Sequence, residues 1–171
     1  MRYNIQELSE ILEKIPDCDA EKFLSAVTTH KRIFIYGAGR SGLMMKAFAM
    51  RLAQAGFTVY VVGETITPAI QEKDILILAS ASGKTASVLN YAKAAKERGA
   101  TVYAITSSSD SALATISDLN VFIPTPTKDS KDSKSIMGTL FEQSVLLFCD
   151  AVIQFACKDT TQMRMRHANL E

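Results

Sequence analysis

A chain of 171 residues, 47% of them hydrophobic and 22% charged, can bury a core and is too apolar for extensive disorder. Its net charge of +1 gives no field that would draw it to nucleic acid or to an anionic membrane. Three irregularly spaced cysteines favour free thiols in a reducing cytosol, and the first seven residues lack the apolar run of a secretory signal. We therefore expect a cytoplasmic protein with no nucleic-acid partner and no membrane partner.

Two helices are predicted before the first strand. Apolar residues recur at helical spacing from Ile5 to Ile15 and stop at Pro16, and Asp19 then opens a second short helix. Together these helices occupy 4–28 and precede an α/β core at 31–124.

Strands and helices alternate through that core. The expected strands are 32–36, 58–62, 74–79, 101–106 and 120–123. The expected helices are 41–55, 85–98, 111–116 and 136–156, with a shorter helical piece near 68–71. Strands that are apolar on both faces and separated by helices predict a parallel sheet covered on both sides. The pattern therefore predicts a single domain with a three-layer α/β/α sandwich around five parallel strands, of the Rossmann-like or flavodoxin-like kind.

The C-terminal part of this domain is expected to be a long helix, with outer bounds 136–157, followed by a tail. The segment that precedes the helix, 125–135, is polar, low in complexity and without apolar periodicity. It is interpreted as a mobile loop or a lid.

An apolar strand that runs into a tight turn and a helix start occurs twice. The first turn is 37–42 (GAGRSG). The dinucleotide fingerprint G-x-G-x-x-G would need its third glycine at Leu43, and Glu64 is the only acid near the end of the second strand. Three interpretations stay open: a dinucleotide site, glycines that only permit close packing of strand and helix, and a substrate-facing role for Arg40 and Ser41.

The second turn, 80–85 (SASGKT), combines backbone N–H groups at a helix start with the hydroxyls of Ser80, Ser82 and Thr85. The positive end of a helix favours an anion, so the turn is interpreted as a phosphate cradle. It is not a P-loop, because the required spacing is absent. The alternative is ordinary helix capping by Ser82. Lys84 opposes the helix dipole and is expected to be solvated.

Glu142 is the best candidate for a general base. It stands near the start of a very apolar predicted helix, where a carboxylate tends to have a raised pKa and can shuttle a proton. The alternative is a favourable acid at a helix N-terminus. His167, one of two histidines, lies in the C-terminal tail, where a histidine is usually exposed. No His, Cys, Asp or Glu cluster has ligand spacing, so no metal is expected.

The two turns, YGAGRSG and ASASGKT, resemble the sugar isomerase (SIS) domain, whose phosphate loop typically reads S-x-S-G-x-T. With GAGRSGLMMKAFAMRL, VYVVGETITPAI, MGTLFEQ and RHANLE, the chain is similar over essentially its whole length to the 6-phospho-3-hexuloisomerase family. That resemblance implies interconversion of D-arabino-3-hexulose 6-phosphate and fructose 6-phosphate in the ribulose monophosphate pathway. It also implies no cofactor and a homotetramer with its sites at subunit interfaces.

The resemblance implies a role for each matching residue. The implied phosphate contacts are Ser80, Ser82 and Thr85, the residues beside the sugar are Gly39, Arg40 and Ser41, the base is Glu142, and His167 would come from a neighbouring subunit. The phosphate loop of the family more often reads G-S-G-E-T, so Ala81 replaces a glycine and Lys84 an acid. Two rival functions are a non-catalytic sugar-phosphate sensor, since SIS folds also serve in regulators, and a nucleotide-dependent oxidoreductase.

Overall fold

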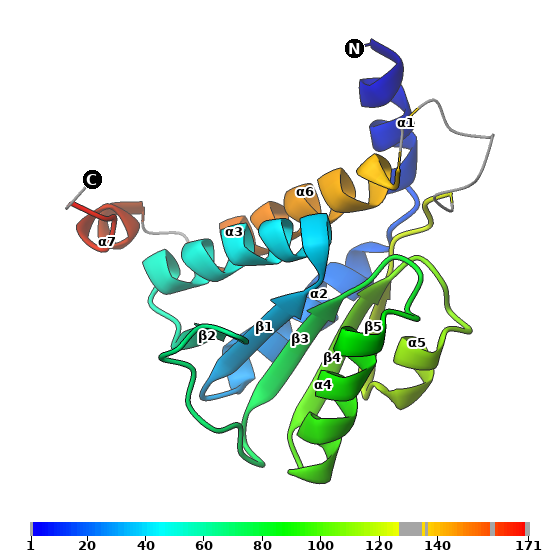
Figure 1. Ribbon diagram of the computed structural model, residues 1–171. Helices are drawn as coiled ribbons and strands as arrows, with labels where there is room; N and C mark the ends of the chain where they lie inside the picture. Colours follow the sequence, from blue (N-terminus) through cyan, green and yellow to red (C-terminus); the bar gives the residue numbers. More distant parts are fainter. Residues whose placement is uncertain (1, 127–134, 136, 158–159, 170–171) are drawn as a thin grey trace.

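The computed structural model describes residues 2–126, 135, 137–157 and 160–169. Five strands form one sheet in the order β2-β1-β3-β4-β5, and every neighbouring pair is parallel (Figure 1). The strands are β1 (Ile33–Gly37), β2 (Val59–Val61), β3 (Ile75–Ala79), β4 (Thr101–Thr106) and β5 (Leu119–Phe122). The predicted five-stranded parallel sheet is confirmed.

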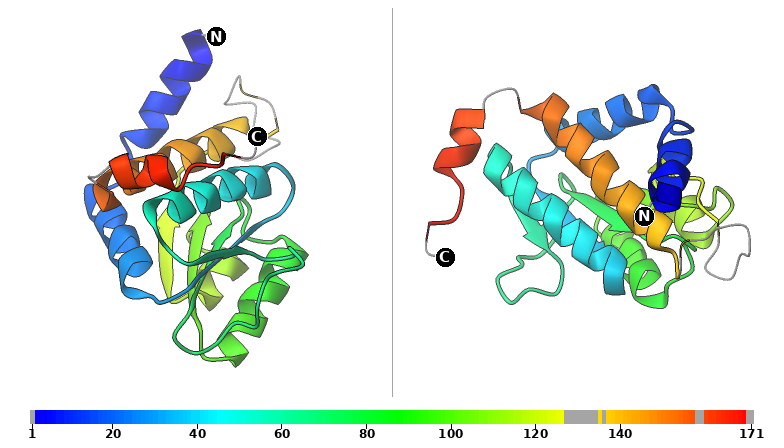
Figure 2. Two further views of the ribbon diagram at one scale, coloured as in Figure 1. Left: turned by 90° about the vertical axis from the view of Figure 1, so that its left-hand side faces the viewer. Right: turned by 90° about the horizontal axis from the view of Figure 1, so that it is seen from above.

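Helices cover both faces of the sheet, which confirms the three-layer α/β/α architecture (Figures 1 and 2). On one face lie α2 (Asp17–Thr29), α3 (Gly39–Ala55) and α6 (Thr139–Ala156), and α1 (Arg2–Leu12) packs on α6 farther from the sheet. On the other face lie α4 (Ala86–Glu97) and α5 (Ala112–Ile116). A last helix that the sequence pattern did not predict, α7 (Thr160–Met165), packs against α3.

The core follows the apolar pattern of the strands. Every residue of the central strand β3 is buried, and each fully buried Ile or Leu side chain contributes about 1.5–3 kcal/mol. On the α3 and α6 side, the ring of Phe23 from α2 packs edge-on against Tyr103 of β4 and Phe148 of α6, with centroids 4.8 and 5.3 Å away. These contacts join the N-terminal helices and α6 to the sheet in one core.

The expected helical piece near 68–71 is absent, and this prediction is wrong. The backbone there is held by distant partners, because Arg32 donates to the carbonyl of Ala69 and the N–H of Gln71 donates to Asp74. Burial would raise the pKa of Asp74, but its hydrogen bonds to Arg32 and Gln71 outweigh burial and hold that pKa below its usual value. These bonds hold 68–71 in a non-helical path before β3.

The long C-terminal helix begins later than predicted. Met137 and Gly138 have positive φ angles of 53° and 79°, which are incompatible with a right-handed helix, and α6 therefore starts at Thr139. The predicted start at Ile136 and most of the predicted loop or lid, 127–134, lie outside the described residues.

By length and composition alone, α6 could cross a membrane. Half of its 18 residues are buried inside the protein, however, where the helix packs against α1, α2 and α3. Core helices of folded domains often have such a composition, and α6 is the central helix of its layer (Figure 2).

The strand order places both turns of interest at one point. In an open parallel sheet, ligands bind at the carboxyl ends of the strands where neighbouring strands continue to opposite faces. Here β1 leads to α3 on one face, and its neighbour β3 leads to α4 on the other. The turns after β1 and β3 therefore meet at the switch point of the sheet.

Candidate active site

The turn between β3 and α4 leaves the start of α4 without a side-chain cap. Thr85 is the N-cap residue, yet its side chain makes no capping hydrogen bond. Its hydroxyl instead lies 3.0 Å from the hydroxyl of Ser80. Ser82 accepts a hydrogen bond from the N–H of Lys84 within the turn, so the alternative of Ser82 as the helix cap is wrong. The N–H groups at the start of α4 can therefore face an anion.

The glycines of the first turn serve two different purposes. A Cβ atom on Gly42 would lie 2.4 Å from the carbonyl oxygen of Gly37, so these two glycines allow the end of β1 to touch the start of α3. Gly39 has a φ of 58°, and a Cβ there would meet nothing within 4 Å. Close packing thus accounts for Gly37 and Gly42, whereas Gly39 borders open space.

The first turn also contacts the candidate base. Arg40 Nε lies 2.9 Å from Glu142 Oε2, and Glu142 is only 6% exposed in the first turn of α6. Burial disfavours a charged carboxylate, and the guanidinium beside it favours the charge. Glu142 is therefore buried, as expected from its apolar helix, but it is also paired with a cation from α3.

The two turns and α6 enclose a cavity of about 260 Å³. Six of the eight predicted site residues line it: Gly39, Ser41, Ser80, Ser82, Thr85 and Glu142. Arg40 is not among the lining residues, but its guanidinium pairs with one of them, Glu142. The cavity combines hydroxyl and backbone donors on the β3–α4 side with a buried carboxylate on the α6 side, which suits an anionic ester whose carbon chain reaches a base.

The eighth predicted residue, His167, lies elsewhere in the same chain. It is exposed and follows α7, and its neighbour Arg166 donates to the carbonyl of Gln54 near the end of α3. Glu142 stands at the other end of α6, a helix about 27 Å long at 1.5 Å per residue. Within one chain, the tail that follows α7 therefore lies far from the start of α6, where Glu142 stands (Figure 2).

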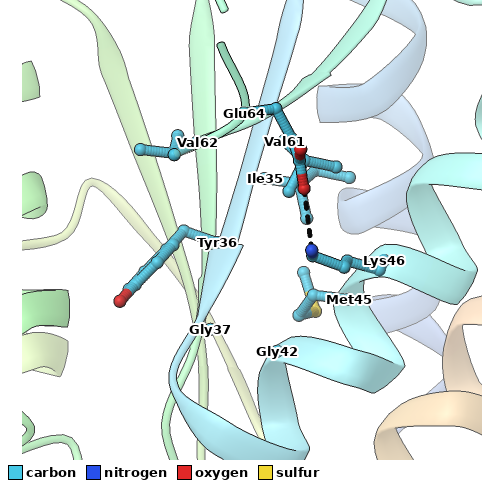
Figure 3. A pocket seen from close by; sticks show the side chains of 10 residues that line it. Ile35, Tyr36, Gly37, Gly42, Met45, Lys46, Val61, Val62 and Glu64 are labelled. Carbon is cyan, nitrogen blue, oxygen red and sulfur yellow. Dashed lines mark hydrogen bonds and ion pairs between the residues drawn. The ribbon is translucent and has the colours of Figure 1, made fainter.

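A second cavity of about 220 Å³ lies on the other side of the first turn, between α3 and the ends of β1 and β2 (Figure 3). Glu64, the acid that a dinucleotide ribose would need, is paired there with Lys46, whose Nζ lies 2.7 Å from Glu64 Oε1. The cavity lies on the β2 side of the first turn, whereas β3 and the second turn lie on its other side. These features weaken the dinucleotide interpretation. Across the described ranges, no group of three or more His, Cys, Asp and Glu side chains could hold a metal ion.

A family model described as the SIS domain matches residues 27–147. The chain belongs to the SIS domain family. The chain is 39% identical to the 3-hexulose-6-phosphate isomerase of Bacillus subtilis, with 98% of this chain and 95% of that protein covered. It is 44% identical to the enzyme of the same name from Mycobacterium gastri, with 82% and 74% covered.

A solved structure agrees with this family assignment. A Methanococcus jannaschii protein, whose structure led to an inferred function of 3-hexulose-6-phosphate isomerase, superposes with a TM-score of 0.89 at 35% identity. The alignment covers 99% of this chain and 98% of that one. The expected resemblance to hexulose-phosphate isomerases is confirmed, and so is the expectation of an isomerase.

Sequence reasoning missed two features of this SIS-domain site. Gly138, at the N-cap of α6, lines the cavity, and its place before an apolar helix was the available signal. A third polar turn, 106–111 (TSSSDS), follows β4 and packs against the β3–α4 turn. Its run of hydroxyls after an apolar strand repeats the pattern of the second turn and could have been recognised.

Proposed function

We propose that this chain, as a single domain, interconverts D-arabino-3-hexulose 6-phosphate and fructose 6-phosphate in the cytoplasm, as a step of the ribulose monophosphate pathway. The observation that carries the proposal is the cavity at the switch point, in which Ser80, Ser82 and Thr85 face the same space as Glu142. Relatives at 39% and 44% identity that are named 3-hexulose-6-phosphate isomerase support the same substrate.

The phosphate ester is held by the β3–α4 turn. The hydroxyls of Ser80, Ser82 and Thr85 and the uncapped N–H groups of α4 donate to the phosphate oxygens. Donors of this kind hold the ester at one end of the cavity and leave the carbon chain to extend toward α6. Lys84 is exposed and adds only screened charge.

Glu142 moves the proton at the other end of the cavity. It removes the proton from C2 of the 3-hexulose phosphate, and the electron pair forms the C2–C3 double bond of a cis-enediol intermediate in which O2 and O3 share one proton. That proton moves from O2 to O3, and the proton held by Glu142 returns to C3, which leaves the C2 ketone of fructose 6-phosphate. Arg40, whose guanidinium lies beside the carboxylate, stabilises the negative charge that develops on the enediol oxygens.

The active form is a homotetramer in which His167 of a neighbouring subunit completes the site. Apolar side chains left exposed along the outer side of α3 and α6 support this assembly: Leu43, Met50, Leu147 and Phe155. Large exposed apolar side chains on adjoining helices are typical of a protein–protein interface. A site shared between subunits also accounts for a histidine that lies far from Glu142 within its own chain.

A coupled assay tests the proposal by detecting fructose 6-phosphate formed from 3-hexulose 6-phosphate. Turnover by the wild-type chain, lost on Glu142→Gln, supports an isomerase that uses this cavity. If the chain binds fructose 6-phosphate yet turns over no 3-hexulose 6-phosphate, it is a sugar-phosphate sensor and the proposal fails.

A further inference from the structure

The third polar turn, 106–111, is hydrogen-bonded to the second, 80–85. Thr106, at the end of β4, is fully buried, and its Oγ1 donates a hydrogen bond of 3.2 Å to the carbonyl oxygen of Ala81. The N–H of Ser107 donates to the same oxygen at 3.0 Å. One carbonyl of the proposed phosphate turn is thus fixed by two donors from a different strand.

Fixing that carbonyl also fixes the next N–H group. The peptide bond between Ala81 and Ser82 is trans and planar, so its C=O and N–H point in opposite directions. Since the carbonyl points toward Thr106, the N–H of Ser82 points away from β4. Within the described part of the chain, this N–H has no hydrogen-bond acceptor.

The β3–α4 turn is also tightly packed against the start of α5. A Cβ on Gly83 would lie 2.2 Å from Ser111 Oγ and 3.2 Å from Thr106 Oγ1, so only glycine fits between the turn and α5. The carbonyl of Gly83 also accepts a hydrogen bond of 3.0 Å, from the N–H of Leu113. Three hydrogen bonds from Thr106, Ser107 and Leu113 therefore hold the carbonyls of Ala81 and Gly83 toward β4 and α5.

We propose that Thr106 is a positioning residue for phosphate binding: its hydroxyl orients the Ala81–Ser82 peptide so that the Ser82 N–H donates to the phosphate. This inference rests on the proposed function and assigns a role to a residue that touches no substrate. The hydroxyl is specifically required because it also accepts a bond of 3.3 Å from the N–H of Ser108. Valine has the same shape and can neither donate nor accept.

The test compares Thr106→Val with Thr106→Ser and with wild type. Binding of inorganic phosphate and of fructose 6-phosphate is measured by titration calorimetry, and KM and kcat by the coupled assay. We expect Thr106→Val to raise both Kd values and KM in parallel by about two- to ten-fold, the effect of losing one hydrogen bond, with kcat unchanged. Thr106→Ser should restore wild-type binding, because it keeps the hydroxyl.

The matched control is Thr115→Val. Thr115 Oγ1 also bonds a backbone carbonyl, that of Ser111, but it lies on α5 and does not touch the phosphate turn. This variant should bind both ligands as wild type does. A general loss of stability would lower the melting temperature of Thr106→Val and Thr106→Ser alike without a change specific to phosphate.

Two outcomes would overturn the assignment. If Thr106→Val binds phosphate and fructose 6-phosphate as tightly as wild type, Thr106 does not position the turn, while the proposed isomerase stands. If wild type binds neither ligand, the phosphate turn itself is wrongly assigned, and the proposed function fails together with the role of Thr106.

Discussion

The turns after β1 and β3 have the same local design and different uses. In the first, Gly37 and Gly42 are needed for the close contact between strand and helix, because a Cβ on either would clash with backbone atoms. In the second, the backbone is held from behind by Thr106 and Ser107, and three hydroxyls face the cavity. A strand–turn–helix unit therefore becomes a candidate anion site only where its donors remain unsatisfied.

The charged residues of the two turns also differ in what they contact. Arg40 of the first turn contacts the buried Glu142, whereas Lys84 of the second is exposed. The first turn thus pairs with the carboxylate, and the second lines the cavity with uncharged donors. Four experiments test whether the base, the strand–helix packing and the phosphate contacts depend on separate residues in this way.

Replacing the carboxylate should have the largest effect. Glu142→Gln keeps the size of the side chain but cannot accept the proton, so kcat should fall about 10²–10⁴-fold while KM changes little. Steady-state kinetics in the coupled assay measure both. The control Glu97→Gln, at the exposed end of α4, should behave as wild type. Near-wild-type kcat in Glu142→Gln would exclude this residue as the base.

Within the first turn, Gly42→Ala and Gly39→Asn should fail in different ways. The new Cβ at position 42 meets backbone that cannot yield, so the free energy of unfolding should drop by about 1–3 kcal/mol in urea. Asparagine tolerates a positive φ, and position 39 has open space, so Gly39→Asn should stay nearly as stable. Its larger side chain enters the cavity and should raise KM instead. Equal losses of stability in both variants would contradict the division of the turn into packing and open positions.

Removing one hydroxyl from each turn should show which turn binds the phosphate. Ser82→Ala should raise KM about 10- to 100-fold, since a hydrogen bond to a charged group contributes about 1.5–3 kcal/mol. Ser41→Ala, beside the uncharged part of the sugar, should raise KM by no more than about ten-fold. A larger effect for Ser41 than for Ser82 would place the phosphate at the first turn.

Lys84→Met should have the smallest effect. An exposed charge contributes about 0–1 kcal/mol, so KM should rise by less than about five-fold at low salt. Screening at 1 M salt should remove that difference. KM that rises strongly and stays raised at high salt would show that Lys84 touches the phosphate directly.

Much of the fold could be predicted because its signals are local. Apolar runs at Ile75–Ala79 and Thr101–Thr106 define strands, and turn chemistry marks where helices start. The structure also brings six of the eight predicted site residues to one cavity. Five of them lie on turns that follow neighbouring parallel strands, and such turns meet at one edge of the sheet. The helix expected near 68–71 failed because Arg32 and Asp74, which bond this segment, come from other parts of the chain.

The amino-acid sequence by itself determined the parallel sheet, the two polar turns and the apolar helix that carries Glu142, since each depends on neighbours a few residues away. Only the tertiary structure decided that Arg40 pairs with Glu142, that Glu64 is paired with Lys46, and that Thr106 donates a hydrogen bond to the β3–α4 turn. These contacts join residues on separate elements, and their geometry is set by how the helices and strands pack.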